Sequence, residues 1–143
     1  MYGGRAGTKE LDELWVYDEN DGTWELKNTA GLGPGSRQGH SAVALGNSLM
    51  IWGGKNGSNF YWDLHMYNTL DNLWEEVQVK STFDPTGAEG AWMEVYNDDL
   101  YIFGGKNDFN AKRELWKFNL GSKEYTALSG NYFSPNSVAY SNC

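Results

Sequence analysis

The stretch LMIWGGKNG at residues 49–57 returns fifty-one residues later as LYIFGGKND at residues 100–108. The chain also opens on MYGG, which has the same ending. Each copy is an apolar run that closes on a pair of glycines. When the second glycine of each pair is taken as the origin, the three origins are Gly4, Gly54 and Gly105. This regular interval indicates an internal repeat, and the rest of the chain can be aligned to it.

Further landmarks keep the same register in all three copies. A leucine follows the origin by ten residues, a Tyr or Phe by thirteen, and a Trp or Tyr by twenty. These sets are Leu14, Leu64 and Leu115; Tyr17, Tyr67 and Phe118; and Trp24, Trp74 and Tyr125. A proline follows each set, as Pro34, Pro85 and Pro135. Periods of 50 and 51 residues are typical of β-propeller blades and exceed those of most helical repeats.

Each unit contains the pattern of four short strands. The segments 36–54 and 88–105 each read as two strands joined by a tight polar turn, at residues 46–48 and 97–99. A third strand carries the alternating LHMYN or LWKFN, and the fourth carries the Trp or Tyr. No segment holds a helical apolar period for three turns. The sequence therefore predicts an all-β chain of about three four-stranded antiparallel blades.

These motifs resemble the kelch repeat. The resemblance rests on the glycine pair, the aromatic residues thirteen and twenty positions later, and the pattern P-x-x-R-x-x-H at residues 34–40. It covers nearly the whole chain and implies a kelch-type β-propeller with units at about 1–27, 37–77 and 88–128, and the start of a further blade at 135–143. The Arg and His positions of the motif are Ala88 and Ala91 in the next unit and Val138 and Ser141 in the last. A role that needs that Arg or His is therefore supported in one unit alone.

The glycine pairs and the aromatic landmarks are expected to be structural. Glycine permits a positive φ and lets a neighbouring backbone approach closely, and the large rings fill the space between blades. A phosphate-binding role is not expected, because no helix follows the glycines. The predicted structural residues are Gly3, Gly4, Tyr17, Trp24, Gly53, Gly54, Tyr67, Trp74, Gly104, Gly105, Phe118 and Tyr125.

The units do not make a complete propeller. Met1 aligns with Ile51, so the chain opens inside the second strand of a blade. Propellers usually close with four to eight blades. We therefore expect an incomplete ring from a longer kelch protein, with uncovered faces on the end blades. Self-association through these open faces, such as two chains forming a six-bladed ring, is the alternative.

Composition excludes some classes of partner. The chain has 143 residues and a net charge of −8, which argues against general nucleic-acid binding. No run of 18 apolar residues predicts a membrane span, and the first ten residues do not resemble a secretory leader. The single cysteine, Cys143, slightly favours a cytoplasmic location, although a sequon at Asn56 keeps a secretory route open.

No catalytic centre or cofactor site is expected from the sequence. His40 and His65 lie on different predicted strands, and with Cys143 they form no metal-binding set. We expect His65 to act as a packing substitute for the Trp found in the other units, and His40 to satisfy backbone groups. Asp18, Asn20 and Asp21 resemble a calcium loop, but their spacing is one residue short, so a solvated turn is expected. Some kelch propellers are enzymes, but none of their site spacings occurs in this sequence.

The sequence favours a non-catalytic protein-binding scaffold. In a propeller, the loops between the second and third strands share one face with the connections between blades. Eight of the eleven basic residues are expected there, together with eight acids, whereas the short turns of the opposite face carry seven acids and one lysine. Basic and aromatic residues on loops are typical of interfaces. The predicted partner-binding residues are Arg5, Arg37, Lys55, Phe60, Tyr61, Lys106, Phe109 and Arg113.

The expected partner is a protein or peptide, and an acidic one is favoured because a cation follows each glycine pair. The alternative for these cations is that they are solvated loop residues that pair with Asp63, Asp108 or Glu114. The alternatives are a carbohydrate-binding propeller, or an enzyme whose site lies in blades outside this chain.

Overall fold

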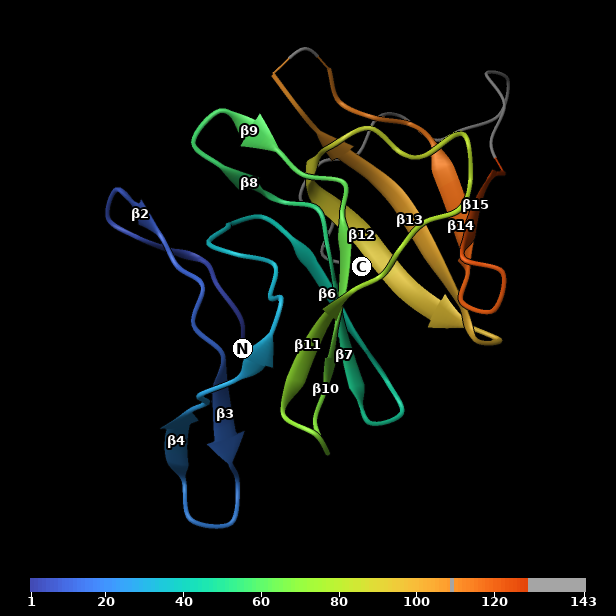
Figure 1. Cartoon of the computed structure of the whole chain (residues 1–143). Coiled ribbons are helices and arrows are strands. Elements are labelled where there is room, and N and C mark those ends of the chain that lie inside the picture. Colours follow the sequence, from blue (N-terminus) through green and yellow to red (C-terminus); the bar gives the residue numbers. More distant parts are fainter. Residues whose placement is uncertain (109, 129–143) are drawn as a thin grey trace.

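The computed structural model describes residues 1–108 and 110–128, and this part of the chain contains strands and turns but no helix. Two antiparallel four-stranded units, which we call blades 2 and 3, form its centre (Figure 1). Blade 2 consists of β6 (Ser41–Leu45), β7 (Ser48–Trp52), β10 (Leu64–Asn68) and β11 (Leu73–Glu76). Blade 3 consists of β12 (Glu89–Tyr96), β13 (Asp99–Lys106), β14 (Leu115–Asn119) and β15 (Glu124–Ala127). The prediction of an all-β fold built from kelch-type blades is confirmed.

Blade 1 is represented by fewer strands. Its hairpin consists of β3 (Trp15–Asp18) and β4 (Thr23–Leu26). The segment before this hairpin is joined to it by a single antiparallel bridge between Tyr2 and Leu14. The short strand β5 (Ala30–Gly31) leaves blade 1 and pairs in parallel with β11 at the outer edge of blade 2. The connection between the two blades is therefore held by backbone hydrogen bonds.

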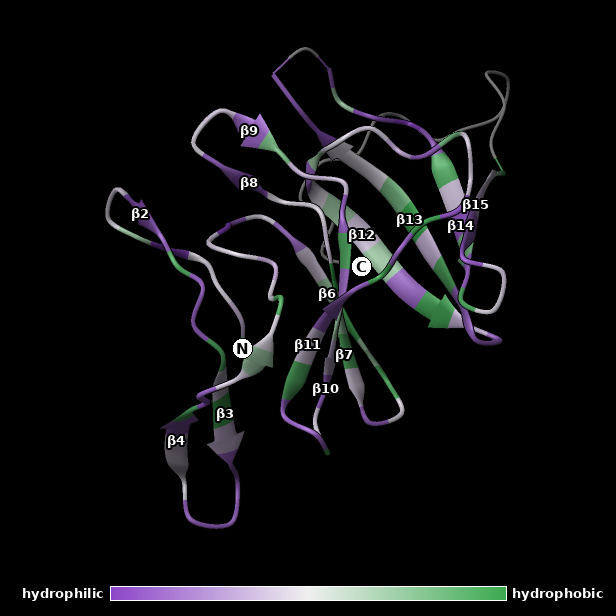
Figure 2. Ribbon diagram, in the orientation of Figure 1, coloured by the Kyte–Doolittle hydropathy of each residue, from purple (hydrophilic) through white to green (hydrophobic). Residues whose placement is uncertain are grey.

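The loops between the second and third strands of the blades gather at one end of the molecule (Figure 1). Two of them form hairpins: β1 (Arg5–Ala6) with β2 (Lys9–Glu10), and β8 (Lys55–Asn56) with β9 (Asn59–Phe60). The third is the loop from β13 to β14, residues 107–114. We call this end the long-loop face. It and the short turns at the opposite end are mainly hydrophilic, while hydrophobic segments lie on the blade strands (Figure 2).

The predicted tight turns are present between the first two strands of blades 2 and 3. In blade 2 the turn consists of Gly46 and Asn47, and only the glycine has a positive φ, at +56°. In blade 3 both Asn97 and Asp98 have positive φ, at +51° and +61°. Positive φ at one or both central residues is what two-residue hairpins require, because it matches the twist of the strands.

The glycine pair of blade 2 lies at close contacts between backbones. In blade 2, Gly53 and Gly54 have φ values of +67° and +88°. A Cβ on Gly53 would lie 2.9 Å from the carbonyl oxygen of Ala88, in the next blade. A Cβ on Gly54 would lie 2.7 Å from the carbonyl oxygen of Gln38, in its own blade. Because neither glycine has a side chain, the end of β7 can contact the backbone of blade 3 on one side. On the other side it can contact the backbone of the segment that precedes β6 in its own blade.

Two hydrophobic clusters lie between successive blades. Tyr67 and Trp74 of blade 2 pack with Tyr2 and Leu14 of blade 1, with ring centroids of Tyr2 and Trp74 separated by 5.1 Å. In the same way Phe118 and Tyr125 of blade 3 pack with Met50, Trp52 and Leu64 of blade 2. The aromatic landmarks of blades 2 and 3 thus cover the preceding blade.

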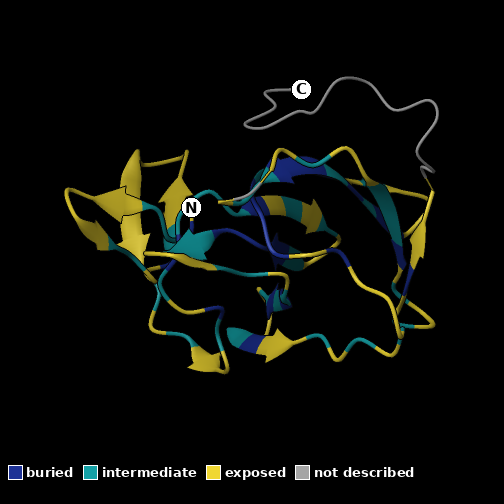
Figure 3. Ribbon diagram, turned by 90° about the horizontal axis from the view of Figure 1, so that it is seen from above, coloured by how far each residue is buried: buried dark blue, intermediate teal, exposed yellow. Residues whose placement is uncertain are grey.

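Tyr17 and Trp24 of blade 1 occupy the same repeat positions but have no such cover. Trp24 is 54% exposed, compared with 3% for Trp74. The strands near the N-terminus are correspondingly exposed, whereas the interior of the two central blades is buried (Figure 3). Trp24 and Tyr17 still pack on each other, with centroids 5.1 Å apart.

Candidate partner-binding face

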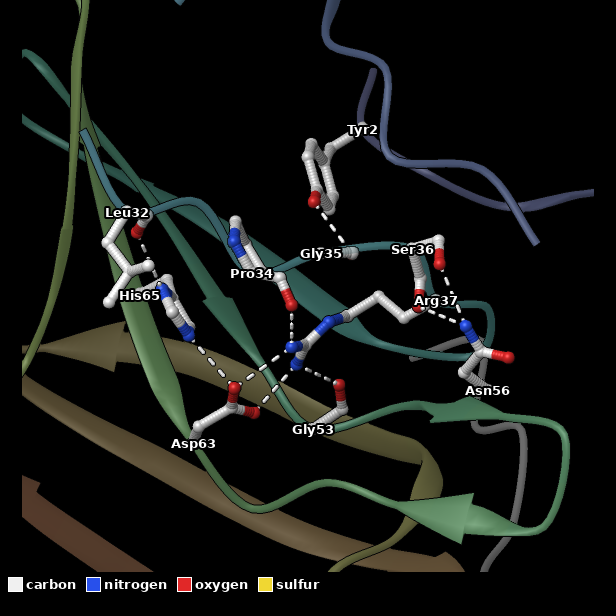
Figure 4. A network of polar contacts seen from close by, with 10 residues as sticks. All are labelled: Tyr2, Leu32, Pro34, Gly35, Ser36, Arg37, Gly53, Asn56, Asp63 and His65. Carbon is white, nitrogen blue, oxygen red and sulfur yellow. Dashed lines mark hydrogen bonds and ion pairs between the residues drawn. The ribbon is translucent and has the colours of Figure 1, made fainter. Parts of the chain in front are cut away.

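Arg37 was expected to contact a partner, and this prediction is wrong. Its side chain is 1% exposed and forms a two-pronged ion pair with Asp63, at 2.7 Å to Oδ1 and 2.9 Å to Oδ2 (Figure 4). The guanidinium also donates to the carbonyl oxygens of Gly53, at 2.9 Å, and Pro34. Through these hydrogen bonds, Arg37 fixes the connection between blades 1 and 2 against the end of β7. Arg37 is therefore a structural residue.

Two rings complete the surroundings of Arg37. Its guanidinium carbon lies 4.3 Å from the ring centroid of Tyr61, a cation–π distance. His65 contacts Asp63 through Nε2, at 2.8 Å, and the carbonyl oxygen of Leu32 through Nδ1, at 3.2 Å. His65 was expected to be a packing substitute; it is buried, but it is also a hydrogen-bonding residue that ties Leu32 to β10 (Figure 4).

The electrostatics of this network favour an ionised Asp63. Burial alone would raise the pKa of its carboxyl group, but the hydrogen bonds from Arg37 and His65 outweigh burial and lower the pKa to about 2. Burial and the Arg37 charge lower the pKa of the nearby His40 to about 4. The buried Nδ1 of His40 has no hydrogen-bond partner among the described residues.

Two of the three cations that follow the glycine pairs, Lys55 and Lys106, are close to one carboxylate. Lys55 Nζ lies 2.9 Å from Oε1 of Glu89, and Lys106 Nζ lies 3.8 Å from the same oxygen. Glu89 is buried at the start of β12. The sequence placed it among the acids of the long-loop face, but the acids expected to pair with these cations were Asp63, Asp108 and Glu114. The structure instead uses Glu89 of blade 3 to join the second-strand ends of blades 2 and 3.

The remaining predicted contact residues differ in accessibility. Arg5 is exposed on the β1–β2 hairpin, where its Nε donates to the carbonyl oxygen of Gly7 at 2.7 Å. Phe60 and Tyr61 are partly buried, and the ammonium group of Lys55 lies 5.5 Å from the Phe60 ring centroid. Arg113 is exposed. Phe109 lies outside the described residues.

Trp62, which sequence analysis did not select, is a large exposed aromatic residue at this end. It lies two residues after the end of β9 and is 54% exposed. The same repeat position holds Asp12 in blade 1 and Arg113 in blade 3, so the fold does not require an aromatic residue there. This comparison of aligned units could have identified Trp62 from the sequence.

The opposite end carries acids that bond within their own turns. The Asp18 carboxylate accepts from the backbone and side chain of Asn20, and the Asp21 carboxylate accepts from Thr23. This is the arrangement of a solvated turn. In the part of the chain that the structure describes, no three His, Cys, Asp or Glu residues are grouped to hold a metal ion. The same part contains no helix of the length and hydrophobicity needed to cross a membrane.

Comparison with known proteins identifies the repeat. The family that matches is described as the KLHDC2/KLHL20/DRC7 Kelch-repeats domain, and the match covers residues 1–143. Kelch domain-containing protein 10 of Homo sapiens is 30% identical over 125 residues, which is 85% of this chain and 28% of that protein. Tip elongation aberrant protein 1 of Schizosaccharomyces pombe is 32% identical over 116 residues, 78% of this chain and 10% of that protein.

Kelch domain-containing protein 3 of Homo sapiens is 28% identical over 128 residues, 81% of this chain and 32% of that protein. The chain thus spans about a third or less of the length of these curated relatives. The glycine pairs, the aromatic residues between blades and the family match agree, and the chain belongs to the kelch-repeat family.

Proposed function

We propose that the chain is part of a non-catalytic scaffold whose long-loop face binds a segment of another protein. Kelch repeats commonly mediate protein interactions, which gives the general class of function. The observation that supports this face is Trp62, an exposed ring on a segment fixed between β9 and β10. Tryptophan and arginine are the residues most enriched at the centres of interfaces.

The proposed partner segment is acidic. Arg5 is exposed, and Lys55 and Lys106 have side-chain exposures of 25% and 43% while sharing one carboxylate. Lys55 and Lys106 thus bring two positive charges to the single carboxylate of Glu89. Carboxylates or phosphates of a partner would form charge-assisted hydrogen bonds with these cations. The aromatic ring of Trp62 would supply apolar contact beside them.

The test is a selection of random peptides displayed on phage, with the intact protein as bait. We expect the retained peptides to be enriched in Asp and Glu. Arg5→Glu and Trp62→Ala should each weaken binding of a retained peptide at least several-fold without a change in melting temperature. Reversal of Lys55 is unsuitable, because a carboxylate there would face the buried Glu89.

Two substitutions on the opposite end serve as controls. Leu70→Ala removes an exposed apolar side chain from the turn between β10 and β11, and Asp21→Lys reverses a charge in the turn between β3 and β4. Neither should alter peptide binding. If the controls weaken binding as much as the long-loop variants do, the assignment of this face is wrong.

A further inference from the structure

The repeat allows the surroundings of Arg37 in blade 2 to be compared with the same place in blade 3. The guanidinium of Arg37 is held by Asp63, by the carbonyl oxygens of Pro34 and Gly53, and by the ring of Tyr61. Fifty-one residues later these positions are Glu114, Pro85, Gly104 and Lys112, and Arg37 itself becomes Ala88. Blade 3 therefore retains a carboxylate and the two backbone positions but lacks the arginine.

The four equivalent residues lie together around one cavity. Glu114, Pro85, Gly104 and Lys112 line it, with Trp52 on its blade 2 side. Its volume is about 10 Å³. A cavity of about this size holds roughly one water molecule. Lys112 is the wall residue that can move, because it is a long, partly exposed side chain where blade 2 has a tyrosine ring.

Two polar groups that line the cavity, the Glu114 carboxylate and the Trp52 indole N–H, have few hydrogen-bond partners. The Glu114 carboxylate is exposed and accepts the backbone N–H of Arg113 at 3.3 Å, but it forms no ion pair with any residue that the structure describes. Asp63, its counterpart, receives two guanidinium bonds. The buried indole N–H of Trp52 lies near the Tyr125 hydroxyl but makes no hydrogen bond of normal geometry within the described ranges.

We propose that blade 3 carries a guanidinium-binding site, formed by the Glu114 carboxylate and the backbone carbonyls of Pro85 and Gly104, that takes an arginine side chain of a bound protein. Arginine fits better than lysine because its planar fork can bond a carboxylate and backbone carbonyls together, as Arg37 does in blade 2. Entry requires the Lys112 side chain to turn out into solvent. That a bound protein carries the arginine rests on the proposed function; the preference for guanidinium rests on the two blades alone.

Methylguanidinium is the probe, titrated into the intact protein with the indole N–H signal of Trp52 followed by NMR. We expect a saturable shift, and a several-fold weaker effect of methylammonium. Glu114→Gln should abolish the shift, and Lys112→Ala should strengthen binding several-fold by removing a competing cation. Ala88→Arg should also abolish it, because the new guanidinium fills the site from within. Thr82→Arg adds the same charge at an exposed position of the same segment and should leave the shift intact.

Arg37→Ala provides the positive control, since it creates the same vacancy in blade 2. Methylguanidinium should raise the melting temperature of this variant.

If the probe rescues Arg37→Ala while the Trp52 signal of the parent protein does not respond, the proposal is overturned. An equal response to methylammonium overturns the preference for arginine. Should Arg37→Ala fail to fold, a lower melting temperature of Ala88→Arg than of Thr82→Arg overturns the proposal. Peptide selection, in contrast, tests the proposed function without reference to this site.

Discussion

Arg37 and Asp63 form the ion pair that secures the connection into blade 2, and its loss should be costly. Arg37→Ala would leave the Asp63 carboxylate without its main partner in a place where solvent reaches only part of it. Breaking such a pair typically costs about 3 to 5 kcal/mol. We expect a decrease of about 3 kcal/mol in the free energy of unfolding, measured with urea.

The matched control is Lys27→Ala, which removes an ion pair with the largely exposed Glu25. Pairs of this kind contribute less than about 1 kcal/mol. Equal effects of the two substitutions would show that the Arg37 network does not stabilise the fold.

His40 should make the stability of the protein fall on acidification. Burial lowers the folded-state pKa of this imidazole to about 4, below its ordinary value of 6.5. The unfolded chain therefore binds the proton more tightly, so protonation favours unfolding. Stability should decrease as pH falls from 6.5 towards 4, by at most about 3 kcal/mol at about 1.4 kcal/mol per pKa unit. Below that window, the lowered pKa of Asp63 removes further stability as pH falls from 3.8 towards 2.

Urea unfolding at a series of pH values, with His40→Gln as the comparison, tests this assignment. The variant should lose the slope between pH 6.5 and 4 and keep the one below it. An unchanged slope in His40→Gln would assign the effect to other groups.

At the residue scale the sequence located charged residues but not their partners. Arg37 lies in a connection between strands, where arginine is usually exposed, so it was assigned to the binding face. Its partner Asp63 is 26 residues away, and no local spacing reveals that the two meet. The pairing of Glu89 with Lys55 and Lys106 was not predicted for the same reason, because these lysines come from two different blades.

At the scale of the element, the two tryptophans of the same repeat position should behave differently. Trp74 is buried between blades 1 and 2, and its removal leaves a cavity beside Tyr2 and Tyr67. Trp74→Ala should therefore lower the free energy of unfolding by about 3 to 5 kcal/mol.

Trp24→Ala in the same chain should cost much less, because this ring is already half-exposed and loses mainly its contact with Tyr17. Urea denaturation of both variants measures the difference. Equal costs would contradict the assignment of Trp74 to the interface between blades.

The elements that the sequence predicted well are those that local geometry determines. Tight turns need residues that tolerate positive φ, so Gly46 and the pair Asn97–Asp98 could be recognised directly. The hairpins β1–β2 and β8–β9 were not anticipated as strands. Each of their strands has two residues, too few to show a period of two.

At the scale of the whole molecule, the outer surface of blade 1 has the character of an interface. Tyr17, Trp24 and Leu26 are exposed on one face of the hairpin formed by β3 and β4. The corresponding rings of blade 2, Tyr67 and Trp74, are buried against the preceding blade. The repeat therefore presents, on blade 1, a surface of the kind that elsewhere in the chain is covered by another blade.

This surface should make the chain associate with itself when it is the sole protein in solution. Large exposed apolar patches on a soluble protein mark contact sites or cause aggregation. We expect sedimentation at micromolar concentration to show oligomers or aggregates, with a discrete dimer if two chains complete one ring. Trp24→Lys should shift the distribution towards monomer, because it places a charge in the centre of the patch. Leu70→Lys, a change of the same kind at an exposed leucine in the turn after β10, should leave association unaltered. A chain that sediments as a monomer and unfolds cooperatively would show that the blade 1 surface is stable in water.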